Sequence, residues 1–334
     1  MGSAKNLYKP NSLHKACFIN ILLFCLALSA LNAQSVPAAE ENIPYLVTFG
    51  KDAKNGYGDN DHQQVFFIIV PLTYTKAFFI RVFDPDTGGQ YDENIGQFNT
   101  VTNYSVYGGR GNYTERTYKN PPLQSGTLLS SINFDNNAAI DGQWYSLGPF
   151  DPLQGEMVNE LQGRIFKVVN TGITGDDGNL YRYFISTEAN RNIAIEGANT
   201  FTYEYTFRLP SGSNEVVHIY PYIDKNVVSV KQFNFDFDED GMIQIVSASK
   251  NGEPVAVSGD GNWQSSVHAI TEKEHNKSLD IRFIKQSQYA IKNNNIGFYI
   301  TNQYGELLPF YTVPIGGIPK YKYDISVKRI IRNR

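Results

Sequence analysis

The feature that most constrains the fold of this chain is an internal repeat. Its two tryptophans occur in matching phrases, DGQW at Asp141–Trp144 and DGNW at Asp260–Trp263. About twenty residues after each comes a second matching pair, RIFK at Arg164–Lys167 and RFIK at Arg282–Lys285, and a third apolar phrase follows in both places. Three phrases in the same order, at near-constant spacing, predict two homologous copies of one fold.

The segments within both copies have the pattern of β-strands. Short apolar runs such as Val65–Val70, Phe78–Phe83 and Phe233–Phe237 are rich in aromatic and β-branched residues, and they end at Gly, Asn, Asp or Pro. That composition suits half-buried strands, and helical periodicity is almost absent. We therefore predict an all-β chain with two tandem antiparallel β-sandwich, or jelly-roll, domains.

The repeat and the start of the chain place the domain limits. Lys9 and Lys15, the apolar run Ala16–Leu31 and the small residue Ala33 are typical of a secretory signal peptide. The repeated tryptophan is expected to fill the gap between the two sheets of each copy. The predicted segments are a signal peptide over 1–33, a flexible leader over 34–43, a first sandwich over 44–208 with an insertion at about 102–135 that the second copy lacks, and a second sandwich over 209–334.

Cysteine content and net charge limit the compartments in which the protein can reside and the partners that it can bind. Both cysteines, Cys17 and Cys25, lie inside the predicted signal peptide, so the exported part has no disulfide. Residues 34–334 hold 26 basic and 33 acidic residues, a net charge of −7. An acidic exported chain is a poor match for nucleic acid or an anionic membrane. We expect it in the periplasm, on the outer surface or outside the cell, with no transmembrane segment after cleavage.

An acid-rich stretch in the second copy, FNFDFDEDG, is a candidate calcium site. Calcium takes roughly six to eight oxygen ligands, and closely spaced carboxylates repel one another without a cation. The alternative is a hairpin, with phenylalanines on one face of a strand and acids on the other, because alternate side chains point to opposite faces. The candidate ligands here are Asp236, Asp238 and Asp240.

The first copy has acids on two segments. FDPDTGGQYDE follows the strand predicted over Phe78–Phe83, and GYGDNDH precedes the strand predicted over Val65–Val70. If these strands are neighbours, their acids meet at one rim and can hold a structural calcium ion; two ordinary turns are the alternative. Such an ion would stabilise a chain without disulfides by binding only its folded state. The candidate ligands are Asp59, Asp61, Asp84, Asp86 and Asp92.

Tyrosines make the predicted insertion a candidate binding surface. The stretch TNYSVYGGRGNYTERTYKN contains Tyr104, Tyr107, Tyr113 and Tyr118. Tyrosine rings can stack on sugars or anchor a protein partner, or they can pack down on the sandwich. The sequence contains no Gly-x-Ser-x-Gly elbow, no His-Glu-x-x-His motif and no phosphate loop, so we do not expect an enzyme.

A signal peptide, a cysteine-free exported part and tandem Tyr/Asn-rich sandwiches with Asp/Gly turns together resemble exported β-sandwich proteins of Bacteroidota. FFIRVFDPDTGG also looks like the calcium-binding jelly rolls attached to secreted bacterial enzymes and adhesins. We therefore predict a non-catalytic binding or structural protein of the cell envelope or surface, stabilised by calcium, whose partner is an envelope protein or a glycan. The alternatives are a carbohydrate-binding module protein and, third, a glycan-active hydrolase.

Overall fold

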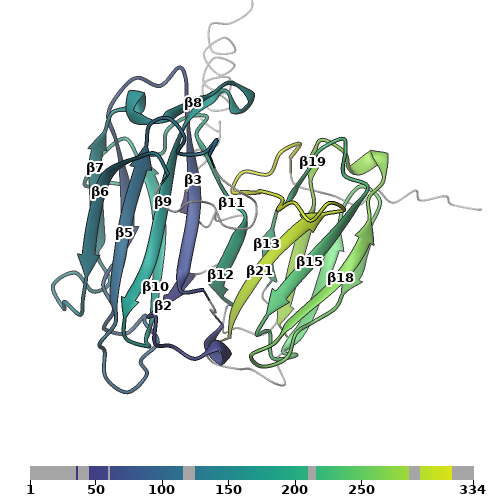
Figure 1. Cartoon of the computed structure of the whole chain (residues 1–334), viewed down its shortest axis with the longest axis horizontal. Helices are drawn as coiled ribbons and strands as arrows, with labels where there is room; N and C mark the ends of the chain where they lie inside the picture. Colours follow the sequence, from purple (N-terminus) through teal and green to yellow (C-terminus); the bar gives the residue numbers. More distant parts are fainter. Residues whose placement is uncertain are drawn as a thin grey trace, which may run out of the picture. The chain divides into compact units, whose positions relative to one another are not determined.

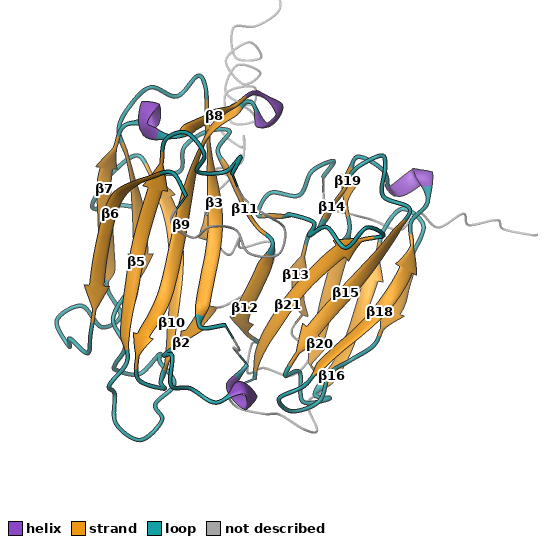
Figure 2. Cartoon of the chain, viewed as in Figure 1, coloured by secondary structure: helices purple, strands orange, loops and turns teal. Residues whose placement is uncertain are grey.

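The described part of the chain is built from β-strands. The structure, a computed structural model, describes residues 35–36, 45–58, 61–115, 125–209, 216–285 and 294–317. Its strands pair antiparallel in sheets of nine, seven, four and two, and the helices among these residues are single 3₁₀ turns (Figure 2). The predicted all-β class is confirmed. The 3₁₀ turns are η2 (Asn55–Tyr57), η3 (Pro152–Gln154), η4 (Asn159–Leu161) and η5 (Glu272–Glu274).

Eight strands of each copy pair in the same order. In the first copy the two sheets run β3-β9-β5-β6 and β2-β10-β4-β7; in the second they run β13-β20-β16-β17 and β12-β21-β15-β18. The internal repeat is therefore present in the topology, as two β-sandwiches. The strands of the first copy are β2 (Tyr45–Phe49), β3 (Gln63–Pro71), β4 (Phe78–Phe83), β5 (Val101–Gly108), β6 (Thr127–Phe134), β7 (Trp144–Phe150), β9 (Gly163–Thr174) and β10 (Gly178–Ser186).

The second copy is shorter in most of its strands. They are β12 (Glu204–Arg208), β13 (Val216–Ile219), β15 (Ser229–Phe235), β16 (Gly241–Val246), β17 (Asn251–Val255), β18 (Trp263–Ala269), β20 (Asp280–Lys285) and β21 (Asn295–Asn302). The remaining strands are β1 (Ser35–Val36), β8 (Glu156–Val158), β11 (Asn199–Thr202), β14 (Tyr222–Ile223), β19 (Lys277–Ser278) and β22 (Phe310–Tyr311).

The pairing pattern corrects the predicted limits of the copies. Because β12 is the counterpart of β2, the second copy begins at Glu204, ahead of the predicted start at 209. The predicted insertion at 102–135 is not an extra element, because it contains β5 and β6, whose counterparts are β16 and β17. In the predicted leader, the backbone of β1 pairs with β10. The predicted signal peptide lies outside the described residues.

The two copies meet through equivalent strands. β2 pairs antiparallel with β12 (Figure 1). In this pairing Leu46 stands opposite Phe207. The repeat makes these two residues counterparts, since Leu46 also faces Tyr181 of β10 and Phe207 faces Ile296 of β21. Antiparallel pairing of equivalent strands places a local two-fold axis at this pair, as in an isologous dimer. The contact also removes the free edge that each sheet would otherwise have.

The hydrophobic core is continuous across this junction. One cluster of buried side chains contains residues of both copies, including Leu46, Phe207 and Phe283, and the Phe207 and Phe283 rings lie 5.3 Å apart at their centroids. β11 and β22 further extend the sheet of β3, so a strand from the end of the second copy pairs beside the first. No helix within the described residues is long and apolar enough to cross a membrane.

Because the core is shared, we expect the two copies to unfold together. Phe207→Ala removes a fully buried ring from the junction and should cost about 3–5 kcal/mol. Differential scanning calorimetry should show one transition in the wild type and in the variant, with a lower midpoint in the variant. Leu128→Ala is the control, since Leu128 is 53% exposed and its loss should leave the midpoint nearly unchanged. Two separate transitions would contradict a shared core.

Candidate metal centres at the strand crossovers

Both copies cross from one sheet to the other at the same acidic motif. In the first copy, FDPD leads from the end of β4 to β5; in the second, FDFD leads from the end of β15 to β16. The hairpin considered for FNFDFDEDG does not form, because β15 pairs with β18 and β21 while β16 pairs with β17 and β20. Phe237 is accordingly buried in the core, whereas Phe233 lies on the outer face.

The two crossovers have the same backbone geometry. Asp84 and Asp236, the first acids of the motif, have φ angles of 57° and 58°, which few residues other than glycine adopt and which Asp tolerates better than most. The backbone N–H of Gly142 donates to Oδ1 of Asp84 at 2.7 Å, and that of Gly261 donates to Oδ1 of Asp236 at 2.6 Å. The repeated Asp-Gly before each tryptophan therefore holds the crossover acid in place.

The first centre consists of Asp84, Asp86 and Asp141. Asp84 and Asp86 are fully buried. Oδ2 of Asp84, Oδ1 of Asp86 and Oδ1 of Asp141 are buried and have no hydrogen-bond partner among the described residues. Burying an ionised oxygen without a partner is costly. Three such atoms at one crossover make it a candidate cation site, although among the described residues the acids that bring one oxygen each within 4.8 Å of one another are those of the second centre described below.

Burial and mutual repulsion govern the protonation of these acids. Burial raises the pKa of Asp84 to about 7; the Gly142 hydrogen bond opposes this rise, and the charges of Asp141 and Asp86 add to it. Burial also raises the pKa of Asp86, again with a contribution from Asp141. The charge of Arg182 lowers the pKa of Asp84, and a bound cation would act on these acids in the same direction.

Two glycines allow further oxygen atoms to approach. A Cβ atom at Gly89 would lie 2.0 Å from Oδ1 of Asp141, and one at Gly88 would lie 2.9 Å from Oδ1 of Asn136. The bare backbone is thus required for Asp141 to occupy its position. The amide oxygen of Asn136 lies beside the same turn and is a further candidate ligand, because hard cations accept amide as well as carboxylate oxygens.

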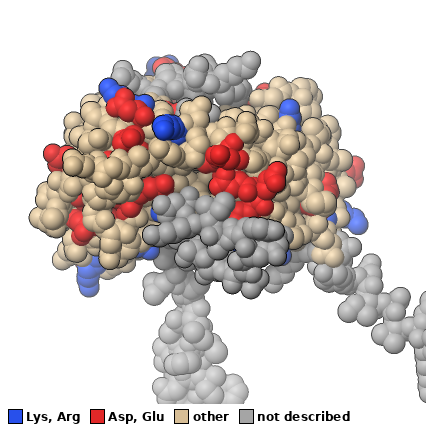
Figure 3. Space-filling view, turned by 90° about the horizontal axis from the view of Figure 1, so that it is seen from below, with Lys and Arg blue, Asp and Glu red and all other residues tan. Residues whose placement is uncertain are grey.

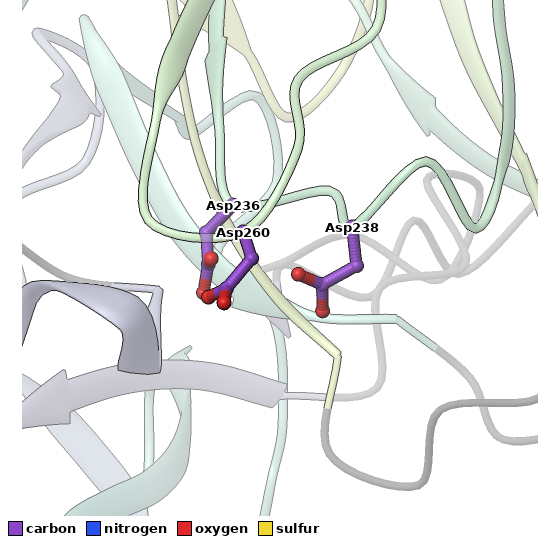
Figure 4. A group of neighbouring side chains, drawn as sticks. All are labelled: Asp236, Asp238 and Asp260. Carbon is purple, nitrogen blue, oxygen red and sulfur yellow. The ribbon is translucent and has the colours of Figure 1, made fainter.

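The second centre consists of Asp236, Asp238 and Asp260. One carboxylate oxygen from each lies within 4.8 Å of the others, and the side chains point toward one another (Figure 4). Asp236 is buried, Asp238 half-buried and Asp260 exposed. Burial raises the pKa of Asp236 to about 6, with the Gly261 hydrogen bond opposing and Asp238 and Asp260 adding. Acidic side chains form a patch on the face shown in Figure 3.

Several predicted ligands have other roles. Asp240 forms an ion pair with Lys285 (3.2 Å), and both residues are buried, so Asp260 replaces Asp240 in the second centre. Both carboxylate oxygens of Asp92 accept backbone hydrogen bonds, from Gly88 at 2.7 Å and Leu180 at 2.6 Å. Asp92 therefore anchors the turn.

The predicted meeting of two acidic loops does not occur as expected. It required β3 and β4 to be neighbours, but they belong to different sheets. Asp61 is exposed, accepts the backbone N–H of Gln63 at 2.9 Å and influences the pKa of Glu204. Asp59 lies outside the described residues.

Asp141 and Asp260 are candidate ligands that the predicted sets did not include, although the sequence contained their signal. Both stand in the repeated DG[QN]W phrase, which was interpreted through its tryptophan alone. That interpretation was wrong about the indole. Trp263 is 37% exposed and packs on Phe235 at 5.1 Å, and Trp144 packs on Phe83 at 5.5 Å, so neither fills the space between sheets.

The predicted tyrosine platform is not formed by the described residues. Tyr104 is fully buried and packs edge-on against Phe134 at 5.4 Å, so it cannot stack on a ligand. Tyr113 packs against Phe67 at 5.5 Å, and the ammonium of Lys167 lies 4.9 Å from the ring of Tyr107. Tyr104 and Tyr107 pack in this way because they belong to β5, a strand rather than a loop, whereas Tyr113 lies beyond the end of that strand. Tyr118 lies outside the described residues.

Comparison with known proteins gives no family for this chain. No family model matches, and no curated protein matches. One similar solved structure is the N-terminal CBM22-1–CBM22-2 tandem domain of Xyn10C from Paenibacillus barcinonensis, at 11% sequence identity, covering 78% of this chain and 81% of that one with a TM-score of 0.15. A likeness this weak supports no argument about fold or function, and the resemblance to Bacteroidota proteins stays a prediction.

A matched pair of glycine variants tests the packing of the first centre. Gly89→Ala and Gly96→Ala both place alanine at a positive φ, 69° and 88°, which costs about 1–2 kcal/mol. Only at Gly89 does the new methyl group meet Asp141, since nothing lies within 4 Å of Gly96. Chemical denaturation should therefore show the larger loss of stability for Gly89→Ala. Equal losses would contradict the close approach of Asp141.

Proposed function

We propose that this chain is a non-catalytic, exported binding or structural protein whose first sandwich is stabilised by a calcium ion at Asp84, Asp86 and Asp141. The observation that carries the proposal is the set of three buried carboxylate oxygens without hydrogen-bond partners. A cation that binds these atoms only in the folded state would stabilise that state. It would serve a chain whose exported part has no cysteine.

Calcium is the cation that best suits this set of donors. The candidate ligands are oxygen atoms only, from carboxylates and the amide of Asn136, with no His or Cys among them. Calcium accepts such ligands in a flexible geometry, whereas magnesium requires near-ideal octahedral coordination. Sites of extracellular modules bind calcium with dissociation constants of roughly 10⁻⁴–10⁻³ M, which suits an exported protein.

A carbohydrate-binding role is the second candidate. It is supported by an open face on the second copy, where the rings of Phe233 and Tyr299 stack at 4.4 Å between centroids. The hydrolase alternative has less support, because no catalytic motif occurs in the sequence.

The calcium proposal predicts a metal-dependent melting temperature. We expect calcium to raise the unfolding midpoint of residues 34–334 relative to EDTA, because a ligand at 100 times its dissociation constant adds about 2.7 kcal/mol of stability. Asp84→Asn/Asp86→Asn should abolish most of this rise. Asp236→Asn/Asp238→Asn should retain it, because the second centre is more open to water.

Asp92→Asn is the matched control for this experiment. Asp92 accepts two backbone hydrogen bonds in the same turn, so its loss should lower the midpoint in calcium and in EDTA alike and leave the difference between them intact. The proposal is wrong if calcium does not shift the wild-type midpoint, or if the Asp84/Asp86 variant keeps the full shift.

A further inference from the structure

The outer face of β18, β15, β21 and β12 carries an open aromatic pair. One row of opposed residues across these strands is Ser265, Phe233, Tyr299 and Glu204. The Phe233 and Tyr299 rings are nearly parallel, at 15° and 4.4 Å between centroids. Trp263 meets the Tyr299 ring edge-on at 5.1 Å. The row thus combines flat apolar surface with hydrogen-bonding groups at both ends.

A groove lies over Phe233, Tyr299 and Glu204 of this row. Its volume is about 800 Å3, and it is lined by the aromatic pair, Glu204, Lys231 and Val267, with the segment after β21 on one side. That segment turns back at the Thr301–Leu307 bridge. Val267 is 65% exposed, so apolar surface on the groove remains in contact with water.

The same face of the first copy is closed by its own chain. Arg81 stands at the position of Phe233, and Ser146 at that of Ser265. Arg81 donates to Asn192, and Ser146 donates to the carbonyl of Ala189. Residues 187–194, which follow β10, are thereby held over the sheet. The second copy has Phe233 where the first has this arginine anchor, and its face is left as a groove.

The charges around the groove favour an uncharged ligand. Lys231 is the cation of the lining, with its ammonium 4.7 Å from the Phe233 ring centroid. Desolvation, with a smaller contribution from Asp61, raises the pKa of Glu204 to about 8, which favours the protonated carboxyl, a group that can both donate and accept. Asp236 follows β15 directly, and the carboxylates of the second centre, to which it belongs, repel an anionic ligand.

We propose that this groove binds a neutral polysaccharide, with sugar rings against Phe233 and Tyr299 and hydroxyls hydrogen-bonded to Glu204 and Lys231. Sugars present apolar C–H faces and many uncharged donors and acceptors, which match an aromatic surface flanked by polar side chains. The proposal specifies the binding role of the exported protein proposed above, and it does not depend on the calcium ion.

The test is isothermal titration of residues 34–334, in saturating calcium, with soluble neutral polysaccharides (β-glucan, xylan and mannan) and with the acidic polymers alginate and polygalacturonate. We expect binding to a neutral polymer, weakened at least about tenfold by Phe233→Ala or Tyr299→Ala, a loss of 1.4 kcal/mol or more. Tyr107→Ala, on the first copy, should bind as the wild type does. Absence of neutral binding, binding of acidic polymers alone, or binding indifferent to the groove variants would overturn the proposal.

Further variants separate misfolding from loss of binding and one proposal from the other. Lys231→Met removes a hydrogen-bond donor from an exposed position and should weaken binding without lowering the unfolding midpoint. Asp84→Asn/Asp86→Asn should keep polysaccharide binding at low temperature while losing the calcium shift. The groove variants should keep the calcium shift while losing binding, so each proposal can fail alone.

The raised pKa of Glu204 also predicts a pH dependence of stability. Its neighbours are Asp61, whose charge adds to the rise, and Tyr299, which stands opposite on β21. Because its folded pKa of about 8 lies above the ordinary value of 4.5, the folded state holds the extra proton between these values, and stability falls as pH rises through that window. Glu204→Gln should therefore match the wild type near pH 5 and exceed it near pH 8.5 in chemical denaturation. If the unfolding free energies of the variant and the wild type differ by the same amount at pH 5 and at pH 8.5, Glu204 ionises at its ordinary pKa.

Discussion

The antiparallel pairing of β2 with β12 is the contact on which the rest of the architecture depends. It joins two sheets into one of nine strands and brings the counterparts Leu46 and Phe207 face to face. Each copy alone would expose a sheet edge, and a sandwich of this size buries less of its surface than a larger domain does. When the copies pair, the edge strand of each sheet hydrogen-bonds to the other copy, and the two hydrophobic cores become one.

The acidic crossovers are the second constraint. A chain that leaves one sheet for the other must turn sharply, and both copies do so with an aspartate at positive φ that accepts a hydrogen bond from an Asp-Gly turn. The two centres then differ in burial. In the first, three carboxylate oxygens are enclosed without partners, whereas in the second Asp260 is exposed to water. The same motif therefore carries different electrostatic costs in the two copies.

Sequence patterns predicted the repeat and the strands because both depend on local order: matched phrases and period-two runs of aromatic and β-branched residues. The predictions were wrong where the position of a residue depends on which strands pair with one another. Alternation in FNFDFDEDG fits a hairpin and a crossover equally well, so Asp240 was grouped with Asp236 although Lys285, from β20, pairs with it. Tyr104 was predicted to lie in a loop, because the Gly and Asn residues around it are typical of loops. It lies instead in β5, which pairs with β6 in a long hairpin. Asp260 stands more than twenty residues from Asp236, a separation that only the fold closes.

Fusion of the two copies in one chain has a consequence for valency. In a symmetric dimer of identical subunits, any substitution appears twice, so an open face on one subunit is an open face on both. Here Arg81 closes the first copy while Phe233 stands in its place in the second. Among the described residues, this sheet face is therefore a groove in the second copy and is covered in the first. If the groove binds a polymer as proposed, attachment through this face would be monovalent, and any gain from avidity would have to come from several chains held side by side.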